Sequence, residues 1–268
     1  MHTQLIRADN PSPYTLAGTN TWVITDGGEV IVADPGPASA RHLRRIAEAV
    51  RGARGVAVVL THGHVDHAEA ALRVAAMVDA PVRAADPRLC QGGPPLADGE
   101  QLRVGGLAVE VIAAPGHTQD SVCFAVTADR ALLTGDTVLG AGSSLVAWPD
   151  GNLGAYLRTL RRLAEFVADH AIDTLLPGHG PVRTDAAAAL SELLQHREQR
   201  LERIRSALRN GARDVDEVYD AVYRPEVVPE LSAAAYSTLL AQLAYVRDIG
   251  ELPADFADWE AALSSEGH

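Results

Sequence analysis

The chain of 268 residues contains no lysine, and all 23 of its basic residues are arginines. Schiff-base enzymes, pyridoxal phosphate enzymes and phosphate-loop nucleotidases each depend on a lysine amine, so the sequence excludes these classes. Cysteine is almost absent too, since only Cys90 and Cys123 occur. They are far apart and show no C-x-x-C spacing, which predicts neither a disulfide framework nor a thiolate metal site.

Two further absences concern location and partners. No run of about 18 apolar residues occurs, so we expect no membrane span. Residues 1–14 lack the apolar stretch of a signal peptide, which predicts a cytoplasmic protein. The net charge of −12 does not favour nonspecific adhesion to nucleic acid.

Metal-binding side chains, by contrast, are concentrated in the segment Thr61–His67. It carries His62, His64, Asp66 and His67. Imidazole and carboxylate are the ligands that zinc takes where no thiolate is offered. A polar surface loop is the alternative, but three histidines around an aspartate favour a metal site. Because four ligands so close together strain a single tetrahedral ion, we expect two ions side by side.

Three more candidate ligands stand in similar settings, each next to a glycine that follows a predicted strand. They are His117 after residues 109–113, Asp136 after residues 130–134, and His179 after residues 172–176. The segment Thr61–His67 likewise follows a predicted strand, at residues 55–60, and precedes a predicted helix, at residues 68–78. Glycine lets the chain turn sharply after a strand. We therefore expect all these ligands on one rim of the fold, held by a rigid scaffold.

Strands and helices alternate through the first two thirds of the chain. Residues 20–33 and 101–113 each read as a hairpin, with turns at Gly27-Gly28 and Gly105-Gly106. This alternation fits two sheets flanked by helices. After Pro181 the pattern is helical, over residues 185–209, 215–222 and 231–247.

The motif His-x-His-x-Asp-His, followed by a distant His, an Asp and a last His, resembles the signature of the metallo-β-lactamase fold superfamily. The resemblance implies an α/β (α+β) fold, a four-layer αββα sandwich with two metal ions at the edge of its sheets. It assigns the first ion to His62, His64 and His117, and the second to Asp66, His67 and His179. Asp136 would bridge two Zn²⁺ ions, with Mn²⁺ or Fe as alternatives.

Three other segments, at residues 15–22, 135–140 and 196–200, resemble the β-lactamase-like protein 2 group. That resemblance implies a hydrolase domain at residues 1–186 and a small, helical, winged-helix-like domain at residues 187–268. The place of a wing, residues 250–260, is short and acidic, so we expect no sequence-specific binding of duplex DNA. A structural role, a homodimer interface or a wall of the substrate cleft is favoured instead.

Two zinc ions would lower the pKa of a shared water to about 7, which makes hydroxide available at neutral pH. The group resemblance implies that this metal-bridging hydroxide attacks a phosphodiester of single-stranded RNA. Hydrolysis of a small thioester or ester, as in the glyoxalase II branch, is the alternative. Asp66 and Asp136 are the predicted catalytic carboxylates. Because the main β-lactam-cleaving zinc enzymes lack a bridging carboxylate, a β-lactamase is less favoured, as is a nucleic-acid-binding regulator.

Substrate contacts are predicted at a few polar positions. The superfamily resemblance brings loops with Asn20, Thr21, Ser143 and Ser144 near the metals, where these side chains could bind substrate oxygens. Capping of turns is the alternative. His196 and Arg197 belong to the long helix. They could face the substrate or dock the domains, and the alternative is that they are ordinary helix-surface residues.

Overall fold

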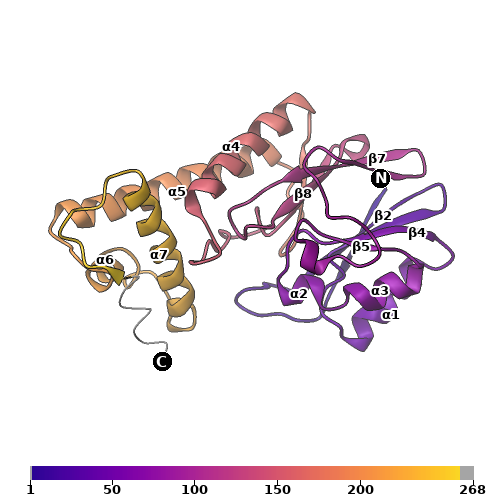
Figure 1. Cartoon of the computed structure of the whole chain (residues 1–268), viewed down its shortest axis with the longest axis horizontal. Coiled ribbons are helices and arrows are strands. Elements are labelled where there is room, and N and C mark those ends of the chain that lie inside the picture. The colour runs from indigo at the N-terminus through magenta and orange to yellow at the C-terminus, as the bar shows by residue number, and fades with distance from the viewer. Residues whose placement is uncertain (1, 260–268) are drawn as a thin grey trace.

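Two five-stranded mixed sheets form the centre of the molecule, described here over residues 2–259 of a computed structural model (Figure 1). The first sheet has the order β1-β2-β3-β4-β5, with strands Thr3–Arg7, Asn20–Asp26, Glu29–Ala33, Arg54–Val59 and Val82–Arg83. The second has the order β10-β9-β8-β7-β6. In chain order from β6, its strands are Gln101–Val104, Leu107–Ala113, Val122–Val126, Ala131–Gly135 and Thr174–Pro177.

Helices cover the outer faces of both sheets, which gives four layers (Figure 1). On the first sheet lie α1 (Ala40–Ala49) and α3 (Ala71–Val78), with the short α2 (Val65–Ala68) before α3. On the second lie α4 (Leu153–Asp169) and the start of α5 (Ala186–Arg209). The short 3-10 helices η1 and η2 span Pro87–Leu89 and Thr127–Asp129. The predicted αββα sandwich is confirmed.

The β2–β3 hairpin shows how local sequence sets the strand register. Asp26 pairs with Glu29, so the loop consists of Gly27 and Gly28, whose φ angles are 56° and 81°. A two-residue loop of this type needs positive φ at both positions, and glycine supplies it without strain. The resulting register sets Ile24 opposite Ile31, and both pack between the sheets.

The strands that precede the predicted ligands end at one edge of the sandwich. Strand β8 is antiparallel to both β7 and β9, and β10 is parallel to β9. Strands β7, β9 and β10 therefore run in the same direction and end on the same side. The N–H of Val122, at the start of β8, donates to the Thr61 carbonyl at 2.8 Å, which brings the loop after β4 to that edge as well.

The C-terminal part is helical, with α5, α6 (Val215–Val222), η3 (Pro229–Leu231) and α7 (Ser232–Asp248). Its apolar side chains form one continuous cluster with α4 and the outer face of the second sheet. Residues 187–259 contain no strand, so the winged-helix-like part of the prediction is not confirmed. Residues 260–268, the end of the expected domain, lie outside the described residues, and the division after residue 186 stays a prediction. Within residues 2–259, no helix is long and apolar enough to cross a membrane.

Truncation of Leu160 tests this shared core. Leu160 on α4 is fully buried in the cluster that joins the second sheet to the C-terminal helices. We expect Leu160→Ala to lower the free energy of unfolding by about 2–5 kcal/mol, measured by chemical denaturation. Leu72 on α3 is 57% exposed, so the matched Leu72→Ala variant should cost less than about 0.5 kcal/mol. Equal losses in the two variants would contradict the packing.

Candidate metal centre

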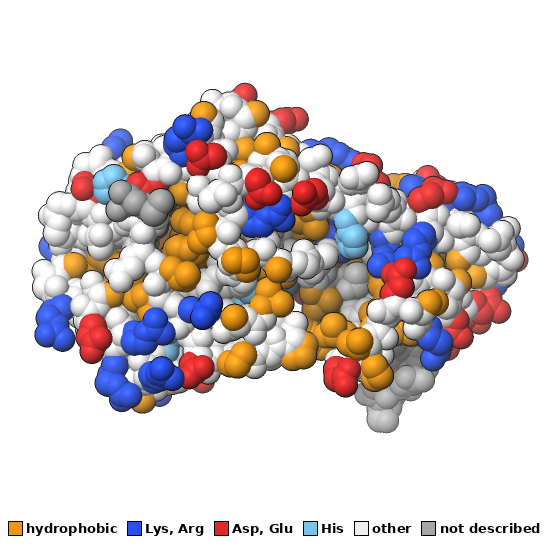
Figure 2. All heavy atoms as spheres, turned by 180° about the vertical axis from the view of Figure 1, so that it is seen from behind, with side chains coloured by type: hydrophobic (Ala, Val, Ile, Leu, Met, Phe, Trp, Pro, Cys, Tyr) orange, Lys and Arg blue, Asp and Glu red, His pale blue; other side chains and the backbone are white. Residues whose placement is uncertain are grey.

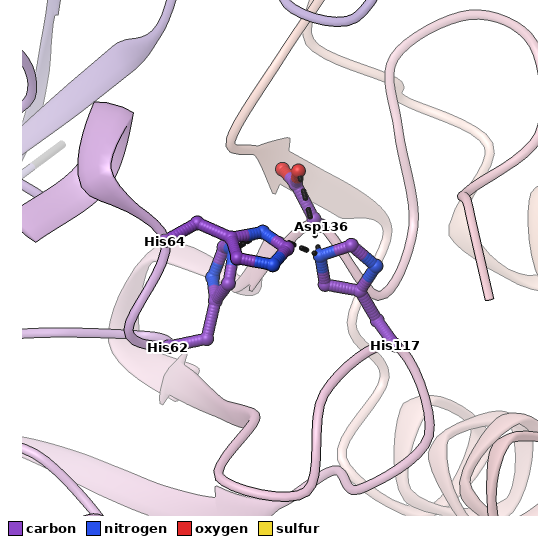
Figure 3. A group of neighbouring side chains, drawn as sticks. All are labelled: His62, His64, His117 and Asp136. Carbon is purple, nitrogen blue, oxygen red and sulfur yellow. Dashed lines mark hydrogen bonds and ion pairs between the residues drawn. The ribbon is translucent and has the colours of Figure 1, made fainter. Parts of the chain in front are cut away.

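Three histidines and one aspartate form the first group of side chains at the sheet edge: His62, His64, His117 and Asp136 (Figure 3). Nε2 of His62 lies 2.9 Å from Nδ1 of His64, and Nε2 of His117 lies 3.2 Å from the same nitrogen. Figure 3 shows the three rings turned toward one another, with the Asp136 carboxylate beside them. Asp136 Oδ2 is 3.8 Å from His117 Nε2.

The second group consists of Asp66, His67 and His179. His179 Nε2 lies 3.2 Å from both His67 Nε2 and Asp66 Oδ2. Asp136 faces this group too, with Oδ1 3.6 Å from His67 Nε2 and Oδ2 3.3 Å from His179 Nε2. The structure thus brings together all the predicted ligands, and Asp136 lies between the two groups. Their roles as ligands stay predictions.

The donor atoms fit divalent cations. Two neutral imidazoles cannot bond through facing lone pairs unless a proton or a metal ion lies between them. Zinc takes such ligands at about 2.0–2.2 Å, so neighbouring ligand atoms around a tetrahedral ion lie about 3.3 Å apart, close to the separations found here. Asp136 Oδ1 is buried and has no hydrogen-bond partner within residues 2–259, as expected of an atom that needs a cation. Each group could hold one ion, and nitrogen and carboxylate ligands accept zinc, manganese or iron.

In the absence of a cation, protons supply positive charge at the centre. Burial alone would lower the pKa of His179, but hydrogen bonds with Asp136 and Asp66 outweigh burial and raise that pKa to about 9. Burial also opposes a charge on His67, yet Asp136 and Asp34 raise the pKa of His67 well above its usual value. These imidazolium charges balance the buried carboxylates. Because a metal ion binds neutral imidazole, it would replace the protons.

Asp34, directly after β3, is a site residue that the sequence analysis missed. Its Oδ2 lies 3.0 Å from His67 Nδ1, and the carboxylate also accepts the Thr61 N–H and hydroxyl, both at 2.7 Å. His67 therefore donates Nδ1–H to Asp34 and keeps Nε2 for the centre, as metal-binding histidines commonly do. The position of Asp34 directly after a predicted strand, before Pro35 and Gly36, is the signal that could have identified it.

A loop of residues 137–145, here called the strap, contacts the elements that carry three of the candidate ligands. It follows Asp136 directly. The Leu145 carbonyl accepts a hydrogen bond from His117 Nδ1 at 2.5 Å, and Gly140 donates its N–H to the His179 carbonyl at 2.9 Å. The strap therefore helps to fix the orientation of the His117 ring.

Helices α4 and α5 hold the strap in place. The Thr137 carbonyl accepts hydrogen bonds from the Tyr156 hydroxyl at 2.7 Å and from the Ser144 hydroxyl at 2.9 Å. Arg197 of α5 is buried, and its Nη2 donates to the Ser144 carbonyl. Its Cζ lies 5.0 Å from the centre of the Tyr156 ring. Arg197 thus links the C-terminal helices to the loop that orients His117.

Asn20 lies apart from the other predicted substrate contacts. It is fully buried, and its Nδ2 donates to the carbonyls of Pro177 and Gly180, both at 2.9 Å. These bonds hold the loop that carries His179. Asn20 does not line the cavity next to the centre, so its side chain positions a loop and does not face that space.

The remaining predicted contacts divide into two kinds. Thr21 is buried, and its hydroxyl donates to the Asp34 carbonyl at 2.7 Å. Ser144 lines the cavity but is buried, and its hydroxyl is used within the strap. Ser143 and His196 line the cavity, and their role as substrate contacts stays a prediction.

The cavity beside both groups, here called the main cavity, has a volume of about 660 Å³. It lies between the sandwich and the C-terminal helices, and His64, Asp66, Asp136 and His179 form part of its lining. The rest of the wall is largely apolar and includes Leu16, Leu139, Val227, Leu231, Ala234 and Ala235.

A metal-capable His/Asp centre at the edge of an αββα sandwich defines a class of metal-dependent hydrolases. The family model of the metallo-β-lactamase superfamily matches residues 14–179 of this chain. The chain belongs to the metallo-β-lactamase superfamily, and it is a hydrolase of that family.

Several fungal proteins are similar in sequence. The chain is 30% identical over 218 residues to the atrochrysone carboxyl ACP thioesterase nsrC of Aspergillus novofumigatus, covering 77% of this chain and 64% of that protein. It is 31% identical over 244 residues to the atrochrysone carboxyl ACP thioesterase of Aspergillus chevalieri, and the match covers 84% of this chain and 73% of that protein. The lactamase-like protein aptB of Emericella nidulans is 30% identical over 264 residues, and the match covers 92% of this chain and 82% of that protein.

Solved structures share the fold. A metallo-β-lactamase family protein of Thermus thermophilus superposes with a TM-score of 0.76 at 23% identity, covering 93% of this chain and 94% of that one. A β-lactamase domain protein of Burkholderia ambifaria gives a TM-score of 0.74 at 22% identity, and the superposition covers 96% of this chain and 91% of that one. The family model confirms the superfamily prediction, whereas the narrower resemblance to the β-lactamase-like protein 2 group is not confirmed.

Metal binding should release protons. With the pKa of His179 raised to about 9, this histidine carries a proton at pH 7.5 in the metal-free protein. Because a metal ion must displace that proton, we expect two Zn²⁺ ions per chain to bind with release of at least one proton. The affinity for Zn²⁺ should therefore rise as the pH approaches 9. Calorimetric titrations in two buffers of different ionisation enthalpy measure both quantities. Binding without proton release would contradict the charge balance at the centre.

Removal of the Arg197 guanidinium should weaken metal binding through the strap. We expect Arg197→Met to lower the affinity for Zn²⁺ about tenfold, the smaller end of the range for groups that orient metal ligands. Competition with a chromogenic chelator measures this affinity. Arg209→Met, near the exposed end of the same helix, is the matched control and should leave it unchanged. Equal affinities in wild type and Arg197→Met would show that the strap does not act on His117.

Proposed function

We propose that the protein hydrolyses a thioester whose acyl group is apolar. In this reaction the acyl carbon–sulfur bond breaks, the oxygen of water joins the acyl carbon, and the thiol leaves with a proton. Two bound divalent ions would supply an activated water and stabilise the charge that develops on the carbonyl oxygen. The observation that carries the proposal is the main cavity, which leads from the candidate metal centre into a largely apolar space.

The far wall of the main cavity comes from η3 and α7, where Leu231, Ala234 and Ala235 face it. Its volume of about 660 Å³ lies within the range of small-molecule sites, about 300–1,000 Å³. Each methylene that an acyl group buries there contributes roughly 0.8 kcal/mol. The cavity thus favours acyl groups of several carbons over an acetyl group, and its apolar wall keeps water from the bound chain.

Two of the similar proteins reported above are named as carboxyl ACP thioesterases. The chain covers 64% and 73% of their lengths, so the likeness supports the type of reaction and not the particular acyl group. Among the reactions open to this fold, thioester hydrolysis therefore has support from both the cavity and the relatives.

RNA cleavage, the first expectation from the sequence, has less support. A site that follows a nucleic-acid backbone needs cations free to contact phosphates. The two arginines that line the main cavity are already engaged, since Arg197 bonds to the strap and Arg200 pairs with Glu226 at 3.2 Å. On the face in Figure 2, basic side chains are interspersed with acidic ones, and hydrophobic side chains occupy much of the middle.

The proposal is tested with zinc-loaded protein and three substrates: the acetyl and octanoyl thioesters of N-acetylcysteamine, and a single-stranded RNA. We expect thiol release from the octanoyl thioester at a higher kcat/KM than from the acetyl thioester, and no cleavage of RNA. The blank is the Asp66→Ala/His67→Ala variant, in which residual activity would reveal contamination. Cleavage of RNA without hydrolysis of either thioester would refute the proposal.

A large side chain in the main cavity should shorten the acyl groups that fit. We expect Ala234→Trp to lower kcat/KM for the octanoyl thioester about tenfold, because two or more methylenes lose their apolar contacts, and to affect the acetyl thioester little. Ala233 precedes it on α7 but is exposed and does not line the cavity, so Ala233→Trp is the matched control. Equal losses for both acyl lengths in Ala234→Trp would place the acyl group elsewhere.

A further inference from the structure

A second depression also begins at His64. This depression of about 730 Å³, here called the polar groove, is lined by the polar side chains of His64, Arg88, Gln119, Asp120 and Asp150 together with apolar ones that include Ala85, Pro87 and Leu89. His64 also lines the main cavity, and it is the exposed member of the first group of candidate ligands. The two spaces therefore meet at the candidate metal centre.

A thioester extends in two directions from its carbonyl carbon, with the acyl group on one side and the thiol arm on the other. When the acyl group fills the main cavity, the thiol arm has to leave the centre by a different route. The polar groove offers this route, because it shares His64 with the main cavity.

The side chains of the polar groove suit an arm with amide and hydroxyl groups. Within residues 2–259, Gln119 and Asp150 have no hydrogen-bond or ion-pair partner, and Gln119 is exposed. Asp120 accepts a hydrogen bond from the Thr118 hydroxyl through Oδ1 at 2.6 Å, which leaves Oδ2 available. The groove thus presents acceptors for N–H and O–H donors, together with one side-chain amide.

The charge of the groove favours a neutral arm along its length. Its one arginine, Arg88, is bound by Asp86 through three contacts of 2.6–3.0 Å. Asp120 and Asp150 form no ion pair within the described part of the chain, so a phosphate placed among them would be repelled. A third depression shares Gln119 and Asp150 with the groove and continues past Asn152 to Arg158. It leaves room for an arm longer than one amide unit, and the arginine lies beyond the groove itself.

We propose that the polar groove binds the amide-bearing thiol arm of an acyl thioester while the main cavity holds the acyl group. The inference rests on the proposed function, and it names the leaving group that this site selects. Gln119 and Asp150 are its specificity-determining residues, because their free polar groups lie along the path of the arm.

The test compares two octanoyl thioesters, one of N-acetylcysteamine with a single amide and one of pantetheine with two amides. We expect the kcat/KM of the wild type to be about three- to tenfold higher for the pantetheine thioester. This factor is the gain expected from one additional hydrogen bond between the second amide and the groove. Gln119→Trp, which fills the groove, should abolish this preference. Asp150→Ala, which removes an acceptor from a separate loop without adding bulk, should reduce it.

Gln4 is exposed on β1 and lines none of these spaces, so Gln4→Trp is the matched control and should keep both rates and the preference. Three results would overturn the inference while leaving thioester hydrolysis intact: no preference in wild type, equal losses on both substrates in Gln119→Trp, or loss of the preference in Ala234→Trp instead. The last result would mean that the two arms are reversed. Failure to hydrolyse either thioester would instead refute the proposed function itself.

Discussion

Carboxylates and imidazoles crowd together at the edge where the two sheets meet, and most of the surrounding structure serves to hold them there. Asp136 is central, since its two oxygens face histidines of both groups at 3.3–3.8 Å. Buried charges of this kind are costly unless they are compensated. Protons on His67 and His179 compensate them in the metal-free protein, and cations would do so in the loaded one. The geometry of the edge is therefore set by charge balance as much as by packing.

The layers of the fold contribute to this edge in different ways. The residue directly after β3, Asp34, fixes the His67 ring, and β2 supplies Asn20, which fixes the loop of His179. The C-terminal helices act from outside the sandwich, through Arg197 and the strap, and they also form the far wall of the main cavity. A helical addition to a sandwich thus takes part both in the orientation of a candidate ligand and in the shape of the main cavity.

The sequence was sufficient to predict the sandwich and the set of side chains that meet at the candidate metal centre, because both depend on local patterns. Strand periodicity, glycines at strand ends and the dense histidine motif each lie within a few residues of chain. Asn20 could not be assigned in this way, since its partners Pro177 and Gly180 are 157 and 160 positions away. Helical patterns at residues 215–222 and 231–247 were also recognised, but periodicity does not reveal how helices pack. The winged-helix-like domain was implied by the group resemblance, and residues 187–259 contain no strand that could form a wing.

The wall of the main cavity is partly held by charge. Glu226, next to Val227 on that wall, pairs with Arg200 at 3.2 Å and Arg203 at 2.7 Å on α5, and about half of its side chain is exposed. Ion pairs in contact with water weaken as salt screens them. The segment around Glu226 would then be less firmly tethered, and the main cavity would admit bulkier molecules. Ionic strength would thus tune the size of the molecules that the main cavity accepts.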